Sequence, residues 1–199
     1  MKGTHTMMKL ARRTLLAATP ALLAGCTLDT SSYPYKPLQH ASVDLGRFMG
    51  KWYINGHIPY FAEKNYVGAY AVYTERGDGA IDDQYNAYPK SFDAKLFQFT
   101  SIDQVEPGTD NAIWRVTALS GSIGVPYVIM QIEPDYSAFM AGFPNRSLGW
   151  IFAREKRMNP AVYQAMLERF YHQGYDARQF RRVAQYPSDI GKPGFETVT

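Results

Sequence analysis

The stretch RFMGKWYINGHIPYF, residues 47–61, decides the fold of this chain. It places Gly50 two positions before Trp52 and continues as an extended run rich in aromatic and β-branched residues, which is typical of a β-strand. Successive side chains of a strand point to opposite faces of the sheet. An indole near the start of a strand has to be buried against something, so the packing partner of Trp52 is the first question that the sequence raises.

Further runs rich in Tyr, Val, Ile, Phe and Thr follow along the chain, separated by short turn signals. Together with the first run, they cover residues 51–58, 66–74, 80–87, 92–102, 112–119, 127–132, 136–142 and 148–154. No interval between them is long enough for a helical crossover, so neighbouring strands are predicted to be antiparallel. Eight such strands can close around side chains or one small ligand. The predicted fold class is therefore all-β, an eight-stranded up-and-down antiparallel β-barrel.

One α-helix is predicted after the eighth strand. Asn159 is suited to cap it, Pro160 to occupy its first turn, and Gly174 to end it in a left-handed conformation. The apolar residues of this helix form a single stripe, so the helix is predicted to pack on the outside of the barrel. The stripe consists of Val162, Tyr163, Met166, Leu167 and Phe170. A short ninth strand is predicted at about residues 180–186.

The beginning of the chain is typical of a secretory signal that ends at a lipoprotein cleavage site. Lys9, Arg12 and Arg13 precede an apolar stretch at 15–23 that is too short to span a bilayer, and Leu-Ala-Gly directly precedes Cys26. Lipid attachment is therefore predicted at Cys26, and an ordinary signal peptide with an incidental cysteine is the alternative. The predicted organisation is a signal peptide at 1–25, a lipidated spacer at 26–42, the barrel domain at 43–187 and a flexible tail at 188–199.

The charge balance argues against nucleic-acid binding. The chain has 21 Lys and Arg and 18 Asp and Glu, and four of the basic residues lie within residues 1–25, which leaves 17 basic residues against 18 acidic ones. No run of Lys or Arg offers the basic patch that phosphate neutralisation requires. Lipid on Cys26 is the only membrane anchor that the sequence predicts. Because Cys26 is the only cysteine, no intramolecular disulfide supports the domain.

The order of eight strands, one helix and a short strand resembles the lipocalins. Gly50 and Trp52, preceded by Asp44 and Arg47, resemble the first signature of that family. The resemblance implies that an arginine at the end of the last barrel strand lies across the tryptophan, and Arg154 occupies that position. A guanidinium over an indole contributes roughly 0.5–2 kcal/mol. The resemblance therefore implies that these two side chains close the floor of a barrel.

The resemblance extends to the bacterial outer-membrane lipoprotein lipocalins and covers about residues 43–187. It is carried by GKWYINGHIPYFAEK at 50–64, IEPDYSAFMAG at 132–142 and GWIFAR at 149–154. The usual Thr-Asp-Pro of the second motif is replaced by Ile-Glu-Pro-Asp, and the family's cysteine pairs are absent. The resemblance implies an outer-membrane protein that is lipid-anchored on the periplasmic face, with a fatty acid or a lysophospholipid as its ligand.

Strand alternation predicts which side chains face the lumen. Ile54, Gly56 and Ile58 should share the face of Trp52, whereas Tyr53, Asn55 and His57 should point outward. Counting back by twos from Arg154, and weaker parity arguments elsewhere, complete the predicted lining. The predicted ligand-binding residues are Ile54, Gly56, Phe97, Phe99, Trp114, Val116, Tyr127, Ile129, Trp150 and Phe152. Such a lumen is aromatic and apolar with a few hydroxyls, which suits an acyl chain.

No catalytic or metal-binding motif stands out in the sequence. His5 lies in the signal, His40 in the spacer and His172 in the last turn of the helix, and His57 is predicted to face outward. Neither a zinc-protease nor a nucleophile-elbow motif is present. Asp82 and Asp83 are adjacent and so point to opposite faces, which favours a solvated turn edge over a catalytic pair. No enzyme activity, metal or cofactor is predicted.

The sequence thus predicts a lipocalin that binds, stores or carries a fatty acid or a lysophospholipid. One alternative is an interaction module whose barrel is filled by its own side chains and which works through exposed aromatic residues, including as a homodimer. A second alternative is an enzyme that acts on a lipid substrate. Detection of a one-to-one complex with lysophospholipid would favour the first interpretation over the interaction module.

Overall fold

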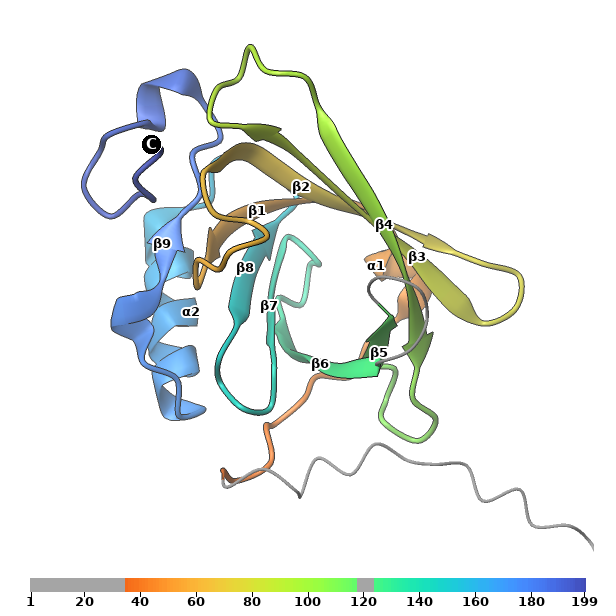
Figure 1. Cartoon of the computed structure of the whole chain (residues 1–199). Coiled ribbons are helices and arrows are strands. Elements are labelled where there is room, and N and C mark those ends of the chain that lie inside the picture. The colour runs from red at the N-terminus through yellow and green to blue at the C-terminus, as the bar shows by residue number, and fades with distance from the viewer. Residues whose placement is uncertain (1–34, 118–123) are drawn as a thin grey trace, which may run out of the picture.

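The computed structural model describes residues 35–117 and 124–199 of the chain. Its strands form one antiparallel sheet that closes on itself, because β1 (Gly50–His57) pairs with both β2 (Tyr66–Glu75) and β8 (Gly149–Ala153). Between them lie β3 (Ala80–Pro89), β4 (Phe97–Val105), β5 (Ile113–Thr117), β6 (Gly124–Ile132) and β7 (Ala138–Gly142). The predicted eight-stranded up-and-down barrel is confirmed (Figure 1).

Strand β1 contains a bulge that changes which side chains face inward. Ile54 pairs with Phe152, but the next residue of β8, Ile151, pairs with Gly56 rather than with Asn55. An extra residue in one strand reverses the alternation beyond it. Beyond the bulge, β1 therefore directs into the barrel the side chains that unbroken alternation would have directed outward.

Apolar side chains form two separate cores. The first lies inside the barrel, and its largest fully buried members include Phe48, Trp52, Tyr73, Trp114 and Phe139. The second lies between the barrel wall and α2 (Pro160–His172) and includes Ile58, Met140, Ile151, Met166 and Phe170. Burial of each large apolar side chain contributes about 1.5–3 kcal/mol, so both the closed barrel and the docked helix are stabilised by packing.

Helix α2 begins and ends as the sequence predicts. The side chain of Asn159 accepts a hydrogen bond of 2.9 Å from the Ala161 N–H, Pro160 occupies the first turn, and Gly174 has a φ of +87°. The helix lies outside the barrel, beside β8 and β9 (Arg181–Arg182) in Figure 1. Strand β9 is shorter than predicted and pairs with Gly56 and His57 of β1.

A short helix that the sequence did not predict, α1 (Leu45–Phe48), precedes β1. Asp44 caps it by accepting a hydrogen bond from the Arg47 N–H, and its last residue places the Phe48 ring in the inner core. Two 3₁₀ turns follow α2, namely η2 (Ala177–Gln179) and η3 (Pro187–Asp189). Helix α1 positions the backbone that the floor of the barrel uses, as described below.

Both ends of the described chain contact the barrel. The Ala41 N–H donates to the Ile129 carbonyl at 2.9 Å, so part of the predicted spacer packs on β6. The segment predicted as a flexible tail folds back, since Phe195 pairs with Arg182 and Glu196 is buried. Cys26 and the predicted signal lie outside the described residues. None of the helices in residues 35–117 and 124–199 is long and apolar enough to cross a membrane.

Candidate ligand-binding site

The floor of the barrel is closed by Trp52 and Arg154, in the arrangement that the resemblance implies. The Cζ of Arg154 lies 3.6 Å from the centroid of the indole ring, which is completely buried, and the indole N–H donates to the Phe48 carbonyl at 2.7 Å. The guanidinium also satisfies backbone carbonyls that would otherwise lack partners. It donates to the carbonyl oxygens of Arg47, Phe48, Met49 and Lys51 at 2.8–3.0 Å.

The third signature residue, Gly50, explains why the guanidinium can approach so closely. Its φ of +93° lies in the region that residues with a side chain rarely adopt. A Cβ at this position would also lie 3.4 Å from the Nη1 of Arg154. Glycine therefore serves both the backbone conformation and the space that Arg154 needs.

Above the floor, aromatic rings from several strands form a continuous band. Trp114 and Tyr127 lie opposite each other on β5 and β6, with ring centroids 6.1 Å apart, and Tyr127 lies 5.8 Å from Trp150 on β8. Phe152 stacks on Phe139 at 4.3 Å, closer to the floor. These residues belong to the inner core, as do Ile54 and Ile129, and Val116 packs against it. The band is the apolar part of the candidate site.

Two predicted lining residues lie toward the end of the barrel away from the floor. Phe99 lies opposite Tyr85 in the register of β3 and β4 and is partly buried. Phe97 keeps 40 % of its surface exposed, and its ring contacts Tyr66 at 5.5 Å. Phe97 therefore belongs to the rim of the barrel rather than to its enclosed part.

The prediction that Gly56 lines the lumen is wrong. A Cβ on Gly56 would lie 2.7 Å from the Tyr163 ring of α2, so this residue faces the outer helix. Ile58 likewise belongs to the outer core, and His57, predicted to face outward, is buried opposite Trp150. The bulge at Asn55 is the physical reason, because it shifts the alternation by one residue.

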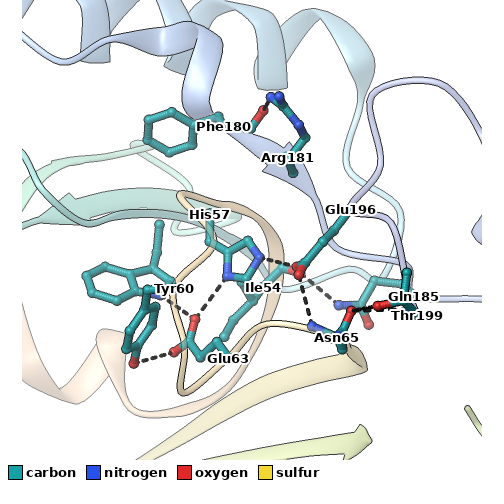
Figure 2. Close-up of polar contacts among 11 residues, drawn as sticks. Ile54, His57, Tyr60, Glu63, Asn65, Phe180, Arg181, Gln185, Glu196 and Thr199 are labelled. Carbon is teal, nitrogen blue, oxygen red and sulfur yellow. Dashed lines mark hydrogen bonds and ion pairs between the residues drawn. The ribbon is translucent and has the colours of Figure 1, made fainter. Parts of the chain in front are cut away.

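His57 is the centre of a polar network that the sequence did not reveal (Figure 2). Its Nδ1 lies 3.0 Å from the Oε2 of Glu63, and its Nε2 lies 2.7 Å from the Oε2 of Glu196. Glu63 also accepts hydrogen bonds from the Trp150 indole N–H at 2.8 Å and from the Tyr60 hydroxyl at 3.3 Å. The network therefore connects the aromatic band to the C-terminal segment.

The two carboxylates decide the charge of this histidine. Burial by itself lowers the pKa of His57, but the hydrogen bonds and charges of Glu196 and Glu63 outweigh burial and raise it to about 9. Burial raises the pKa of Glu196, and its bonds to His57 and to the Asn65 N–H outweigh that effect and lower it. At neutral pH the site therefore holds an imidazolium that donates to both carboxylates.

The C-terminal residues also hold the loop between β1 and β2. The Oε1 of Glu196 accepts a hydrogen bond from the Asn65 N–H at 2.9 Å, and the Asn65 side chain accepts one from the Thr199 N–H at 3.2 Å (Figure 2). Nearby, the amide of Gln185 donates to the carbonyl oxygens of Ile54 and Ala69, which bridges β1 and β2 beyond the end of their pairing.

A second polar group lies inside the barrel, nearer to the floor. Asp83 is opposite Tyr73, and Asp103 is opposite Val116, so both side chains point inward. Burial raises the pKa of Asp103 to about 7, and burial with the negative charge of Asp103 raises the pKa of Asp83 well above its usual value. The assignment of Asp83 to a solvated turn edge is therefore wrong; only Asp82 points outward, where it pairs with Arg76 at 2.8 Å.

The interior of the barrel thus has one sealed end, an aromatic lining and a few buried polar groups. Within residues 35–117 and 124–199, no group of three His, Cys, Asp or Glu side chains is arranged to hold a metal ion. An interior of this composition is chemically suited to a small molecule with an apolar body and a few polar groups.

Comparisons with known proteins agree with this geometry. A sequence profile of the lipocalin-like domain matches residues 43–185. The chain is 28 % identical over 160 residues to temperature-induced lipocalin-1 of Arabidopsis thaliana, and the alignment covers 72 % of this chain and 80 % of that protein. It is 24 % identical over 170 residues to the outer membrane lipoprotein Blc of Escherichia coli K12, and the alignment covers 85 % of this chain and 94 % of Blc.

A solved structure shows the same fold. The cockroach allergen Per a 4 superposes with a TM-score of 0.58 at 16 % sequence identity, and the alignment covers 77 % of this chain and 96 % of the allergen. The closed barrel, the outer helix and the arginine over the tryptophan all lie within the segment that the profile matches. This chain therefore belongs to the lipocalin family.

Proposed function

We propose that this chain is a lipid-anchored outer-membrane lipocalin that binds, stores or carries a fatty acid or a lysophospholipid inside its barrel. The observation that carries the proposal is the floor closed by Trp52 and Arg154 beneath a band of inward-facing aromatic rings. A barrel closed at one end receives a ligand from the other. Each methylene of an acyl chain that leaves water contributes about 0.8 kcal/mol, so a single chain supplies ample driving force before the ordering costs.

Trp150 is the residue that we expect to contact the ligand most directly. Its ring lies between Tyr127 and Phe143, at 5.8 and 5.4 Å, and its N–H is fixed by Glu63. A ring whose polar atom is already satisfied offers its faces to an apolar ligand at little conformational cost. The other proposed contacts are Ile54, Phe97, Phe99, Trp114, Val116, Tyr127, Ile129 and Phe152.

The membrane location rests on two supports. The sequence predicts lipid attachment at Cys26, and one of the relatives is an outer membrane lipoprotein. Attachment of several acyl chains makes membrane binding stable, whereas one chain is marginal. We therefore place the protein on the periplasmic face of the outer membrane, as a binding protein rather than an enzyme. Globomycin treatment of cells, which blocks lipoprotein signal cleavage, should leave the uncleaved precursor if Cys26 is the site.

Native mass spectrometry tests the ligand. After delipidation and incubation with a lysophospholipid, we expect one adduct per chain. Trp150→Ala should weaken the complex by about tenfold or more, because it removes the face that packs on the chain. Tyr171→Ala, at an exposed position of α2, is the matched control and should bind like the parent. Failure of the parent protein to form any adduct would contradict the proposed function.

The interaction module stays the second candidate because of its exposed aromatic side chains. Phe61, in the loop after β1, is 94 % exposed, and Tyr171 on α2 is also largely exposed. Exposed rings of this size are common anchors of protein interfaces. This candidate predicts a concentration-dependent homodimer in analytical ultracentrifugation that Phe61→Ala or Tyr171→Ala abolishes, together with no lipid adduct.

A further inference from the structure

We propose that the lower half of the barrel holds a subsite for an organic cation, in which Asp83, Asp103 and the Tyr127 hydroxyl bind the protonated amine of a ligand with an apolar body. This inference rests on the proposed function and narrows its ligand to an amphiphile that carries a primary amine, which excludes a free fatty acid and leaves a lysophospholipid with an amine in its headgroup. The groups come from β3, β4 and β6, and of these only Tyr127 was assigned to the site from the sequence.

The register of β3 and β4 places the two carboxylates on the same inner face. Asp83 lies opposite Ser101, and Asp103 lies opposite Ile81, so the aspartates are diagonal neighbours on adjacent strands. Diagonal side chains of an antiparallel pair are separated by about 7–8 Å or less at their bases. Two carboxylates at that separation can both contact one positive group between them.

These groups have unused hydrogen-bonding capacity. The Oδ1 of Asp83, the Oδ2 of Asp103 and the hydroxyl of Tyr127 are buried atoms without a hydrogen-bond partner in the described part of the chain. Asp103 is 1 % exposed and accepts one hydrogen bond, from Ser101 at 3.1 Å, while Tyr127 is 7 % exposed. Asp83 as a whole is partly exposed, although its Oδ1 is shielded.

Leaving a buried polar atom unpaired is unfavourable, and most buried polar atoms in proteins have partners. Three such atoms, contributed by three strands to one interior, therefore indicate a missing partner. A partner that keeps both acids ionised has to donate hydrogen bonds, because an ionised carboxylate only accepts them. A protonated amine has three donors, which is the number needed to reach both carboxylates and the hydroxyl oxygen.

Within the described residues, no side chain supplies this cation. No ion pair in residues 35–117 and 124–199 joins a Lys, Arg or His to Asp83 or Asp103. The raised pKa of both carboxyls has the same origin, since burial is its largest cause and Asp103 and Glu63 add negative charge near Asp83. A bound ammonium group would stabilise the ionised carboxylates and lower both pKa values.

The surrounding side chains favour an organic cation over a metal ion. Aromatic rings adjoin the acids: Tyr73 lies opposite Asp83 and 5.5 Å from Trp114, which is 6.1 Å from Tyr127. Ring faces attract ammonium groups and pack on their apolar substituents. Divalent cations of the hard type need six or more oxygen ligands, which two aspartates do not provide. The carboxylate of a fatty acid would be repelled at this depth.

Three amphiphiles with the same chain test the inference: decylamine, decanol and decanoate. We would titrate each into the full chain at neutral pH, where decylamine is protonated, and follow the fluorescence of the buried tryptophans. The subsite predicts that decylamine binds at least about tenfold more tightly than decanol, and decanol more tightly than decanoate, because hydrogen bonds between charged groups are stronger than those between neutral ones. Equal binding of all three would overturn the amine subsite but leave the proposed function standing. Absence of binding by all three would overturn both.

Substitutions locate the subsite. Asp103→Asn and Asp83→Asn should each remove most of the preference for decylamine, while Asp82→Asn, on the neighbouring outward-facing residue, should keep it. If Asp103 had a purely structural role, Asp103→Asn would be less stable than the parent. The subsite instead predicts that Asp103→Asn unfolds at the same or a higher urea concentration than the parent, because the substitution removes an unpaired buried charge. Tyr127→Phe removes only the hydroxyl oxygen and should lower decylamine affinity severalfold, so it tests the subsite even if an Asn variant fails to fold. An unchanged preference in both Asp103→Asn and Tyr127→Phe would refute it.

Discussion

The two ends of the barrel each hold a cation next to a tryptophan, but they hold it in different ways. At the floor, Arg154 stacks on Trp52 and donates to backbone carbonyl oxygens. At the other end, His57 lies between the carboxylates of Glu63 and Glu196, and Trp150 shares one of them. The arginine at the floor therefore contacts carbonyl dipoles and an aromatic ring, whereas the histidine at the far end contacts two negatively charged carboxylates.

This difference matters for how each end responds to pH. An arginine stays protonated throughout the accessible range, so the floor should not depend on pH. The imidazolium of His57 loses its proton near its pKa of about 9, and the hydrogen bond to one carboxylate is then lost. The floor is therefore closed at every accessible pH, whereas the contacts at the far end, which also hold the Trp150 ring, depend on pH.

The largest expected effect is on the floor. Trp52→Ala should lower the free energy of unfolding by about 3–5 kcal/mol, because it removes a fully buried indole and leaves Arg154 without its ring. Urea unfolding at neutral pH, followed by circular dichroism, measures the change. The control Tyr171→Ala alters an exposed ring and should change stability by no more than about 0.5 kcal/mol. Similar losses in both variants would show that the floor is not a special contact.

The second prediction concerns pH and the far end. The pKa of His57 is raised from 6.5 to about 9 in the folded protein, so its contribution is complete below pH 6.5 and is lost as the pH rises through 9. The parent should lose on the order of 3 kcal/mol of unfolding free energy across that window. His57→Gln keeps one hydrogen bond but cannot be charged, so its stability should be flat there.

The same experiment separates His57 from Asp103. Burial raises the pKa of Asp103 from 3.8 to about 7, so the stability that its neutral form contributes is lost between those values as the pH rises. From pH 7.5 to 10, above that window, the difference between the parent and His57→Gln therefore reports on His57, because the two proteins share the same aspartates. If His57→Gln followed the parent curve in that range, the charged network would not be the cause of the dependence.

The ease of prediction also differs between the two ends. The contact that closes the floor could be predicted because its residues have a spacing that is visible in the sequence. These residues are Gly50, Trp52 and Arg154, which directly follows the last strand of the barrel. The far end depends on a bulge at Asn55 that no local pattern signals, and on Glu196, which is 139 positions from His57. Alternation is reliable until a strand gains one residue, after which every assignment beyond it is reversed.

Side-chain burial limits prediction in a second way. Alternation correctly separated Asp82 from Asp83, but it could not show that the inward-facing one would be enclosed, because that depends on the other seven strands closing the barrel. Phe97 illustrates the opposite case, since its parity agrees with the lumen while its height places it at the rim. The sequence pattern therefore predicts on which face of a strand a side chain lies, but the fold decides how deeply that side chain is buried.

A smaller effect is expected from Arg154→Lys. Lysine keeps the positive charge but lacks the planar guanidinium that stacks on Trp52 and reaches several carbonyl oxygens at once. The loss should be about 1–2 kcal/mol, since at least one buried carbonyl loses its donor. Unlike the change at His57, this loss should be the same at pH 6 and at pH 9.5. Arg157→Lys, at a largely exposed side chain, is the matched control.

The smallest expected effect separates backbone strain from the contact with the guanidinium. Gly50 and Gly79 have similar φ values, +93° and +82°, but a Cβ on Gly50 would lie 3.4 Å from the Nη1 of Arg154, whereas a Cβ on Gly79 would have no neighbour within 4 Å. Both alanine variants should lose about 1 kcal/mol from the strained backbone. Gly50→Ala should lose a few tenths of a kcal/mol more, because the guanidinium has to shift over the indole. Introducing each glycine substitution into Arg154→Lys should remove that extra loss, since the shorter-reaching ammonium leaves the space free. If the two glycine positions still differed there by the same amount, the difference would belong to the backbone, and the close approach of Arg154 would not be the reason for glycine at position 50.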